Sequence, residues 1–497
     1  MPHPIFEIDE LLRLIIDELV NISPRAVVSF ALTCRSLEEP TLSLLWKRQR
    51  SLANLVKVLP QYSWIEGKRN VRSLVGGCDF LPDQVLRQPQ VIKPDPPHED
   101  WGRLQQYASW MDTLFLGLED NITIDALSCL SRNSPDGVLC PKLEHLVWRF
   151  DDSTVPLSSF RLFFSPHLKR VTLSTYFRRH VFGPELVASL CEVVSCLPDS
   201  LENMCLMCGQ GGEPLKDAIS SYVCRSGLSL RSFGSSEPLS DAAFEHLMQL
   251  PNLRSWIATH EPPRTPPLAT FPALEELHLY PEALPWLHLL AGNEDGQLRS
   301  GLAPAAILSP TIGETLKTLG FPSHILVDPK LLSSISSFRN LVTVCVENDC
   351  CFYYYGGGPC LFRLTDDNVE SLAIALPSLV TLRLGKVCDS ETSRTTVYSL
   401  LSISVHCLEL AHLEIHFNTL SIVDDIQRLF NGGFGHDKPR CKLRILSVEY
   451  LPLEVREEDI GVIAAGFADI FPCLEAFSLG ERRERGGWNA VASKLRD

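Results

Sequence analysis

The chain lacks a long apolar run and an excess of positive charge. No stretch approaches the roughly 18 apolar residues of a membrane-spanning helix, and the acidic N-terminus lacks the basic segment of a secretory signal. Asp and Glu number 60 against 45 Lys and Arg, a net charge of −15, which disfavours binding to nucleic acid and to anionic membranes. The sequence therefore predicts neither a membrane nor a nucleic-acid partner.

A regular cysteine framework is also missing. The 17 cysteines are odd in number, and most lie among apolar residues, as in Val344-Cys345-Val346. A secreted, disulfide-bonded chain would more often show paired, regular spacing. We therefore expect reduced, buried cysteines and a location in the cytoplasm, the nucleus or both.

Motifs of catalysis and metal binding are absent as well. The sequence contains no GxxxxGK[ST], GxGxxG, GxSxG or HExxH motif, and no ordered set of eight Cys/His ligands of a RING domain. His412 and His416 lie in a predicted strand, about 13 Å apart, too far for one metal. Cys205 and Cys208 form a single CxxC without a second pair. We expect no catalytic residue, metal or cofactor, and hence no enzyme.

What is present is a long chain of ordinary globular composition. It has 497 residues, of which 45% are apolar and 21% are charged. These values exclude a mostly disordered chain. The length exceeds that of a usual single domain and predicts several domains or a repeat array.

The first sixty residues predict three short helices. Residues 8–20 place apolar side chains on one helical stripe and charges on the other. Ser23 and Pro24 suit the cap and first position of a second helix, which extends to Cys34. A third helical stretch follows Pro40 and extends to Leu59. Three short helices are too few to bury all of these apolar side chains by themselves. The helices therefore either pack on the rest of the chain or present an apolar surface to a partner helix.

Three segments in this order resemble an F-box, and in particular those of fungal F-box proteins. They are Glu10-Leu11-Leu12, Thr33-Cys34-Arg35 and Leu45-Trp46. The chain departs from the family at Asp9, where proline is common. The resemblance covers residues 5–55 and implies an F-box-like helical domain over residues 1–60. It also implies docking on the Skp adaptor and, through it, a cullin of a ubiquitin ligase.

The resemblance implies an adaptor-binding surface drawn from all three helices. Intramolecular core remains the alternative for each residue. The predicted contacts are Leu11, Leu12, Ile15, Ile16, Leu19, Val28, Ala31, Leu32, Cys34, Leu45 and Trp46.

The remaining chain repeats a short apolar phrase. An anchor residue is followed by apolar residues three and five positions later, at a mean spacing of about 31 residues. The anchors are Leu143, Leu168, Leu201, Leu253, Leu274, Leu316, Leu341, Leu379, Leu410, Leu443 and Leu474, with weaker copies at Val71, Met111 and Leu230. This spacing suits one strand and one helix per unit.

Proline marks the boundary inside many units. It stands two residues before the anchor in six units, for example at Pro377 before Leu379. Proline ends a helix and favours an extended residue before it. Helical spacing precedes it at Val369, Leu372, Ala373 and Leu376, with Asp366 or Asp367 as the expected cap, and at Ile460, Ile463, Ala464 and Phe467.

The repeat resembles a degenerate leucine-rich repeat. We predict an α/β fold in which the N-terminal three-helix F-box is followed, over residues 61–490, by an irregular leucine-rich-repeat solenoid with a parallel sheet on its concave face. Two ordinary α/β domains with leucine-rich strands remain the alternative. Loops are expected at residues 88–100, 261–272 and 350–360.

Candidate substrate-binding residues lie between the anchors and on the tyrosine-rich loop. Their mixed charge and hydrogen-bonding groups suit a protein partner. Each strand residue could equally be a solvated face, and the tyrosines could pack on the solenoid. The candidates are His278, Tyr280, Arg383, His412, Glu414, His416, Tyr353, Tyr354 and Tyr355.

The sequence thus predicts a substrate-recognition adaptor of an Skp–cullin–F-box ubiquitin ligase, whose solenoid binds an unknown protein substrate. The alternative is a scaffold outside the ligase, in which the F-box-like helices cap the solenoid. A hydrolase or metal enzyme in an irregular α/β fold is the third hypothesis, without a supporting motif.

Overall fold

The computed structural model divides into two compact units, Met1–Phe244 (unit 1) and Glu245–Asp497 (unit 2). The boundary falls within helix α9 (Asp241–Gln249). The described residues are 9–60, 64–66, 90–92, 98–117, 124–150, 157–175, 182–261, 271–291, 310–322, 327–346, 364–384, 394–415, 417–418, 421–431, 440–448, 455–479 and 487–495.

Unit 1 begins with three helices, α1 (Asp9–Ile22), α2 (Pro24–Ala31) and α3 (Arg35–Lys47). Pro24 is the first residue of α2, after an extended Ser23, as predicted. The predicted end of this helix at Cys34 is wrong, because α2 ends at Ala31 and Cys34 is the N-cap residue of α3. The prediction for the third helix is wrong at both ends, because α3 begins at Arg35, contains Pro40 and ends at Lys47. Proline there removes one helical hydrogen bond, to the carbonyl of Ser36. Ser36 is exposed, so water can satisfy that carbonyl.

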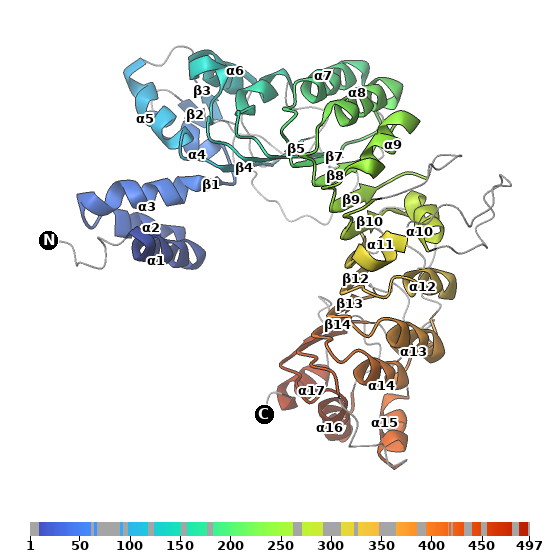
Figure 1. Ribbon diagram of the computed structural model, residues 1–497. Helices are drawn as coiled ribbons and strands as arrows, with labels where there is room; N and C mark the ends of the chain where they lie inside the picture. Colours follow the sequence, from blue (N-terminus) through green and yellow to red (C-terminus); the bar gives the residue numbers. More distant parts are fainter. Residues whose placement is uncertain are drawn as a thin grey trace. The chain divides into compact units, whose positions relative to one another are not determined.

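A parallel sheet follows in unit 1, with its helices on one side (Figure 1). Each strand pairs in parallel with the next, in chain order. The strands are β1 (Arg48–Gln49), β4 (Thr113–Leu116), β5 (His145–Phe150), β6 (Arg170–Thr175), β7 (Asn203–Met207) and β8 (Ser232–Ser235). The helices are α4 (Ala53–Val56), α5 (His98–Ala108), α6 (Ile124–Asn133), α7 (Pro184–Ser195) and α8 (Gly212–Arg225).

Residues 88–100 are not a simple loop. They include β3 (Gln90–Ile92), which pairs antiparallel with β2 (Trp64–Glu66), and the start of α5. The buried Ile92 contributes to the packing. The prolines of this segment predict a loop, but the apolar Val91 and Ile92 stand between Pro89 and Pro94 and belong to β3.

Unit 2 repeats the same arrangement. Its parallel strands, again in chain order, have helices on one side (Figure 1). The strands are β9 (Ser255–Ala258), β10 (Glu276–Leu279), β11 (Thr318–Phe321), β12 (Thr343–Val346), β13 (Thr381–Arg383), β14 (His412–Glu414), β15 (Ile445–Val448) and β16 (Ala476–Leu479). The helices are α10 (Leu284–Leu290), α11 (Pro310–Thr315), α12 (Pro329–Ile335), α13 (Asp366–Ala375), α14 (Val397–His406), α15 (Ile422–Asn431), α16 (Ile460–Ile470) and α17 (Trp488–Lys494).

The anchors explain this regularity. Each strand from β4 to β16 begins two residues after a predicted anchor, and the weak copies at Met111 and Leu230 have fully buried anchors. Within each unit, the residue after the anchor and the next one both donate backbone N–H bonds to a single carbonyl of the preceding repeat, at 2.7–3.1 Å. The prediction of an α/β fold with a parallel sheet is confirmed. The copy at Val71 lies outside the described residues.

The predicted helices before Pro377 and Pro472 are α13 and α16. The predicted cap of α13 is wrong: Thr365 is the cap residue, and it forms a capping box with Asn368. Asp366 instead accepts hydrogen bonds from Thr396 and Ser399, at the start of α14. This carboxylate therefore ties two successive repeats together.

The C-terminal helix covers part of the core of unit 2. Trp488 of α17 is buried and stacks on Phe477 of β16, with ring centroids 6.2 Å apart. Among the described helices, none has the length and apolar character to cross a membrane. The twelve cysteines within the described ranges are free thiols, and five of them are buried.

Candidate functional site

The N-terminal helices have a small core of their own. Leu12 and Ile16 of α1, Val27 of α2 and Leu37 of α3 form one buried cluster. Predicted adaptor contacts Leu12, Ile16 and Ala31 are at most 3% exposed, so they stabilise these helices. Leu19, Cys34 and Leu45 are half-buried and pack against the same cluster.

Other predicted contacts remain on the surface. Leu11 is 37% exposed, Val28 42% and Leu32 78%, and Ile15 is half-exposed. Leu14 is 62% exposed and was missed by the sequence analysis. Its i, i+3 spacing from Leu11, which places both on one side of α1, was the available signal. We call Leu11, Leu14, Val28 and Leu32 the exposed apolar set of α1 and α2.

The end of α3 is attached to the sheet of unit 1. Trp46 stacks on Tyr107 of α5, with ring centroids 4.8 Å apart. The carbonyl of Lys47 accepts a 3.0 Å bond from the Asp112 amide, and the Lys47 ammonium lies 3.4 Å from the Asp112 carboxylate. The chain then enters β1, which pairs with β4. The C-terminal end of α3 is therefore joined to α5 and to the first strands of the sheet, whereas the exposed apolar set lies on α1, on α2 and at the C-cap of α2.

The second candidate site is the open face of the sheet in unit 2, which is the face opposite the helices. The strand register places five side-chain positions in one row across β10 to β14. Three of them, His278, Arg383 and Glu414, are predicted substrate-binding residues. The row consists of His278, Gly320, Cys345, Arg383 and Glu414.

Glycine shapes one end of this row. A Cβ atom at Gly320 would lie 2.2 Å from Nδ1 of His278 and 2.8 Å from its Cε1. Because no carbon atom can occupy that position beside the ring, the imidazole lies directly over Gly320. The neighbouring strand thus has a glycine where the histidine needs space.

A charged pair forms the other end of the row. Arg383 Nε donates a 2.7 Å bond to the Glu414 carboxylate, and its Nη1 lies 3.5 Å from Cys345 Sγ. The Glu414 side chain is 9% exposed and that of Arg383 is 32% exposed. Burial opposes the charge on Arg383, but the bond and charge of Glu414 outweigh it and raise the pKa of the guanidinium. Arg383 therefore keeps its positive charge on the sheet face.

His412 lies in the next row, between Thr381 and Ile445. Burial and the positive charge of Arg383 lower the pKa of His412, against the opposing effect of Glu414. The imidazole is therefore neutral near pH 7 and offers hydrogen bonds without a net charge. His412 and the Arg383–Glu414 pair form one polar cluster on the open face of the sheet.

Five predicted substrate contacts cannot be assigned to this cluster. Tyr280 is buried, and its N–H bonds the carbonyl of Ala258. Tyr353, Tyr354, Tyr355 and His416 lie outside the described residues. Cys345 was missed because apolar neighbours on both sides predicted a buried thiol, although alternation in a strand places it on the opposite face from them.

No metal centre is found in the described parts of either unit, where no three His, Cys, Asp or Glu residues gather as ligands. Of the CxxC pair, Cys208 is buried and burial strongly raises the pKa of its thiol, which disfavours the thiolate that zinc binds. No family model matches the chain, and no curated protein matches it in sequence.

Proposed function

We propose that the chain is a substrate-recognition adaptor of an Skp–cullin–F-box ubiquitin ligase. Helices α1–α3 act as the F-box and dock the Skp adaptor, and the leucine-rich repeats bind a protein substrate. The chain performs no bond chemistry, since it accelerates ubiquitin transfer by bringing a substrate lysine close to the conjugating enzyme. The location proposed with this function is the cytoplasm or the nucleus.

The observation that supports this proposal most strongly is the exposed apolar set of α1 and α2. The cluster around Leu12 and Ile16 already provides these helices with a core, so the exposed leucines are not needed for it. Burying one exposed leucine contributes about 1.5–3 kcal/mol. Leu14 and Leu32, the two most exposed of the set, would therefore contribute much of the binding free energy of a partner helix.

A co-elution experiment tests the docking step. The full chain is co-expressed with the Skp adaptor and analysed by size-exclusion chromatography, beside Leu14→Asp/Leu32→Asp. A charge placed in an apolar contact loses favourable burial and must be desolvated, so the complex should be lost. Leu228→Asp is the matched control, because Leu228 is 66% exposed and lies outside the three helices.

The result expected is co-elution of the wild type and of the Leu228 variant, and loss of the complex in the double variant with unchanged circular dichroism. Co-elution that survives both substitutions would contradict the assignment of this surface. Substituting Leu12 or Ile16 is not informative, since it would unfold the helices.

A second candidate function has support from the attachment of α3. The stack of Trp46 on Tyr107 and the pairing of β1 with β4 are contacts that an end cap would make. In that case the chain is a scaffold whose helices shield the first repeat, as end repeats require. A folded wild type that does not co-elute with the Skp adaptor would favour this function.

A further inference from the structure

One row of exposed side chains follows the amino ends of the strands in each unit. It consists of the residue after each anchor, and we call it the edge ladder. Backbone bonds join each of these residues to the next, so their side chains are neighbours. In unit 1 the ladder is charged throughout, at Asp112, Glu144, Lys169, Glu202 and Arg231.

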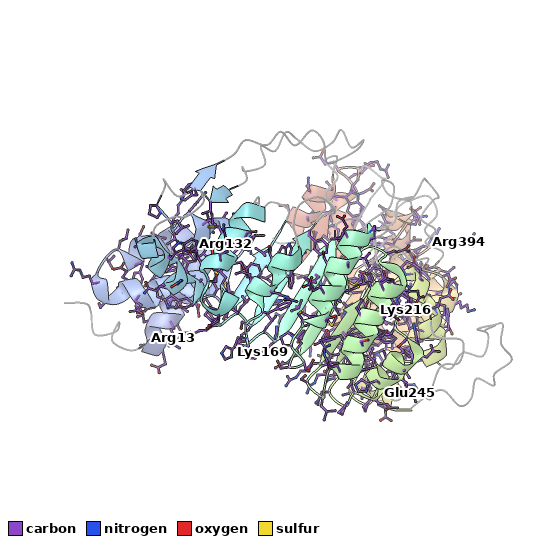
Figure 2. All side chains as sticks on the ribbon, turned by 90° about the horizontal axis from the view of Figure 1, so that it is seen from above. Arg13, Arg132, Lys169, Lys216, Glu245 and Arg394 are labelled. Carbon is purple, nitrogen blue, oxygen red and sulfur yellow. The ribbon has the colours of Figure 1, made fainter. Side chains whose placement is uncertain are left out.

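Opposite charges pair along the ladder. Lys169 lies 3.1 Å from Glu144, and it is labelled at the edge of the sheet in Figure 2. In unit 2, Lys317 lies 3.2 Å from Glu275, and Arg444 lies 3.8 Å from Glu475. These ion pairs are solvent-exposed, so each contributes at most about 1 kcal/mol. A carboxylate of a binding partner can therefore displace the glutamate from the cation, or bind the same cation beside it.

The ladder of unit 2 is interrupted by three successive apolar residues, Val342, Val380 and Ala411. We call these residues the apolar break. Val380 is 36% exposed, and the nearby Ile445 is 40% exposed. Val342 and Ala411 are half-exposed. The first strand positions beside the break, Thr343, Thr381, His412 and Ile445, contain no acidic residue.

The ends of the break are both basic. Backbone bonds run from Val342 to Lys317 at one end and from Arg444 to Ala411 at the other. The acidic partners, Glu275 and Glu475, lie on the outer side of these two cations. The row is thus apolar in the middle, and at each end it has a cation that is ion-paired with a glutamate on its outer side.

We propose that the apolar break binds an extended protein segment with apolar residues in its middle and an acidic residue at each end. Lys317 and Arg444 are four strand spacings apart, about 19 Å at 4.8 Å per strand. An extended chain rises about 3.3 Å per residue, so acidic residues six positions apart span this distance. Both then lie on one side of the segment, with the apolar residues at alternate positions between them.

In the proposed adaptor, this extended segment belongs to the substrate protein. Only that identification of the segment rests on the proposed function. The probe is a fluorescent peptide, Glu-Thr-Val-Thr-Val-Thr-Glu, and fluorescence anisotropy measures its binding to the full chain. A peptide with lysine at both ends is the comparison. We expect at least tenfold tighter binding of the acidic peptide, weakening as salt screens the end contacts.

Two variants test the two parts of the surface. Val380→Asp should weaken binding at least tenfold, whereas Ile374→Asp should leave it unchanged, because Ile374 is 56% exposed but lies on helix α13. Lys317→Glu/Arg444→Glu should reverse the preference in favour of the lysine-ended peptide. Circular dichroism checks that each variant is folded.

Several outcomes would overturn the proposal. These are absence of saturable binding at millimolar peptide, equal binding of the two peptides, and unchanged binding by the Val380 variant. Dimerisation of the chain that the Val380 variant abolishes would assign the surface to a second copy instead. Because these assays contain no Skp adaptor and the Val380 variant should still co-elute with it, failure here is distinguishable from failure of the proposed function.

Discussion

The contact of His278 with Gly320 makes a prediction in which one substitution changes sign. Gly320→Ala places a Cβ atom 2.2 Å from Nδ1 of His278, so the ring must leave its position. Overpacking of this kind costs about 1–3 kcal/mol. Alanine in place of a strand glycine recovers about 0.5–1 kcal/mol of backbone entropy. The net expectation is a loss of about 0–2.5 kcal/mol of unfolding free energy.

In the His278→Ala background the steric conflict is gone, and only the entropy gain remains. There, Gly320→Ala should raise the unfolding free energy by about 0.5–1 kcal/mol. Urea unfolding of the four full-length proteins measures the coupling as a double-mutant cycle. Additive effects, within about 0.5 kcal/mol, would refute the conclusion that the imidazole lies over Gly320.

Three further predictions concern charge and thiols. Arg383→Met leaves the nearly buried carboxylate of Glu414 without its partner and should lower the unfolding free energy, measured by urea unfolding, by about 1–3 kcal/mol. Adding Glu414→Gln should recover this loss. Equal unfolding free energies of the single and the double variant would contradict the prediction. Acid should destabilise the fold, because burial lowers the pKa of three half-buried histidines, His145, His288 and His412. Their contribution is full above the unfolded pKa of about 6.5 and is lost as pH falls through the lower folded values, so a flat profile of unfolding free energy between pH 7 and pH 5 would be the contrary result. Native alkylation followed by mass spectrometry should modify the exposed Cys224 and Cys473 first and leave Cys140, where burial raises the thiol pKa to about 12, intact until unfolding.

The parallel sheet was predictable because its signal is local and repeated. An anchor residue followed by apolar residues three and five positions later predicts one strand in each repeat. Every described strand from β4 to β16 begins two residues after such an anchor. Proline before the anchor marked the helix ends, and the turn it enters is visible as the bond from the Leu379 amide to the Leu376 carbonyl. These features depend on near neighbours in the chain, so the sequence contains them directly.

The exposure of individual side chains could not be predicted in the same way. Leu12 and Leu11 are adjacent and equally apolar, yet one is buried and the other is 37% exposed. Which side of α1 becomes core depends on how α2 and α3 pack against it. The same limit applies to Cys345, whose apolar neighbours indicated burial although its strand turns it to the open face.

The repeated apolar phrase and the charge count were enough to predict the parallel strands from β4 to β16 and the excess of acidic residues, because periodicity and charge follow from local residue types. Only the tertiary structure decided which residues meet. It aligned His278, Gly320, Cys345, Arg383 and Glu414 in one row, although they lie in five separate repeats. It also made neighbours of the edge-ladder residues, since backbone bonding between repeats sets the register that the linear chain does not contain.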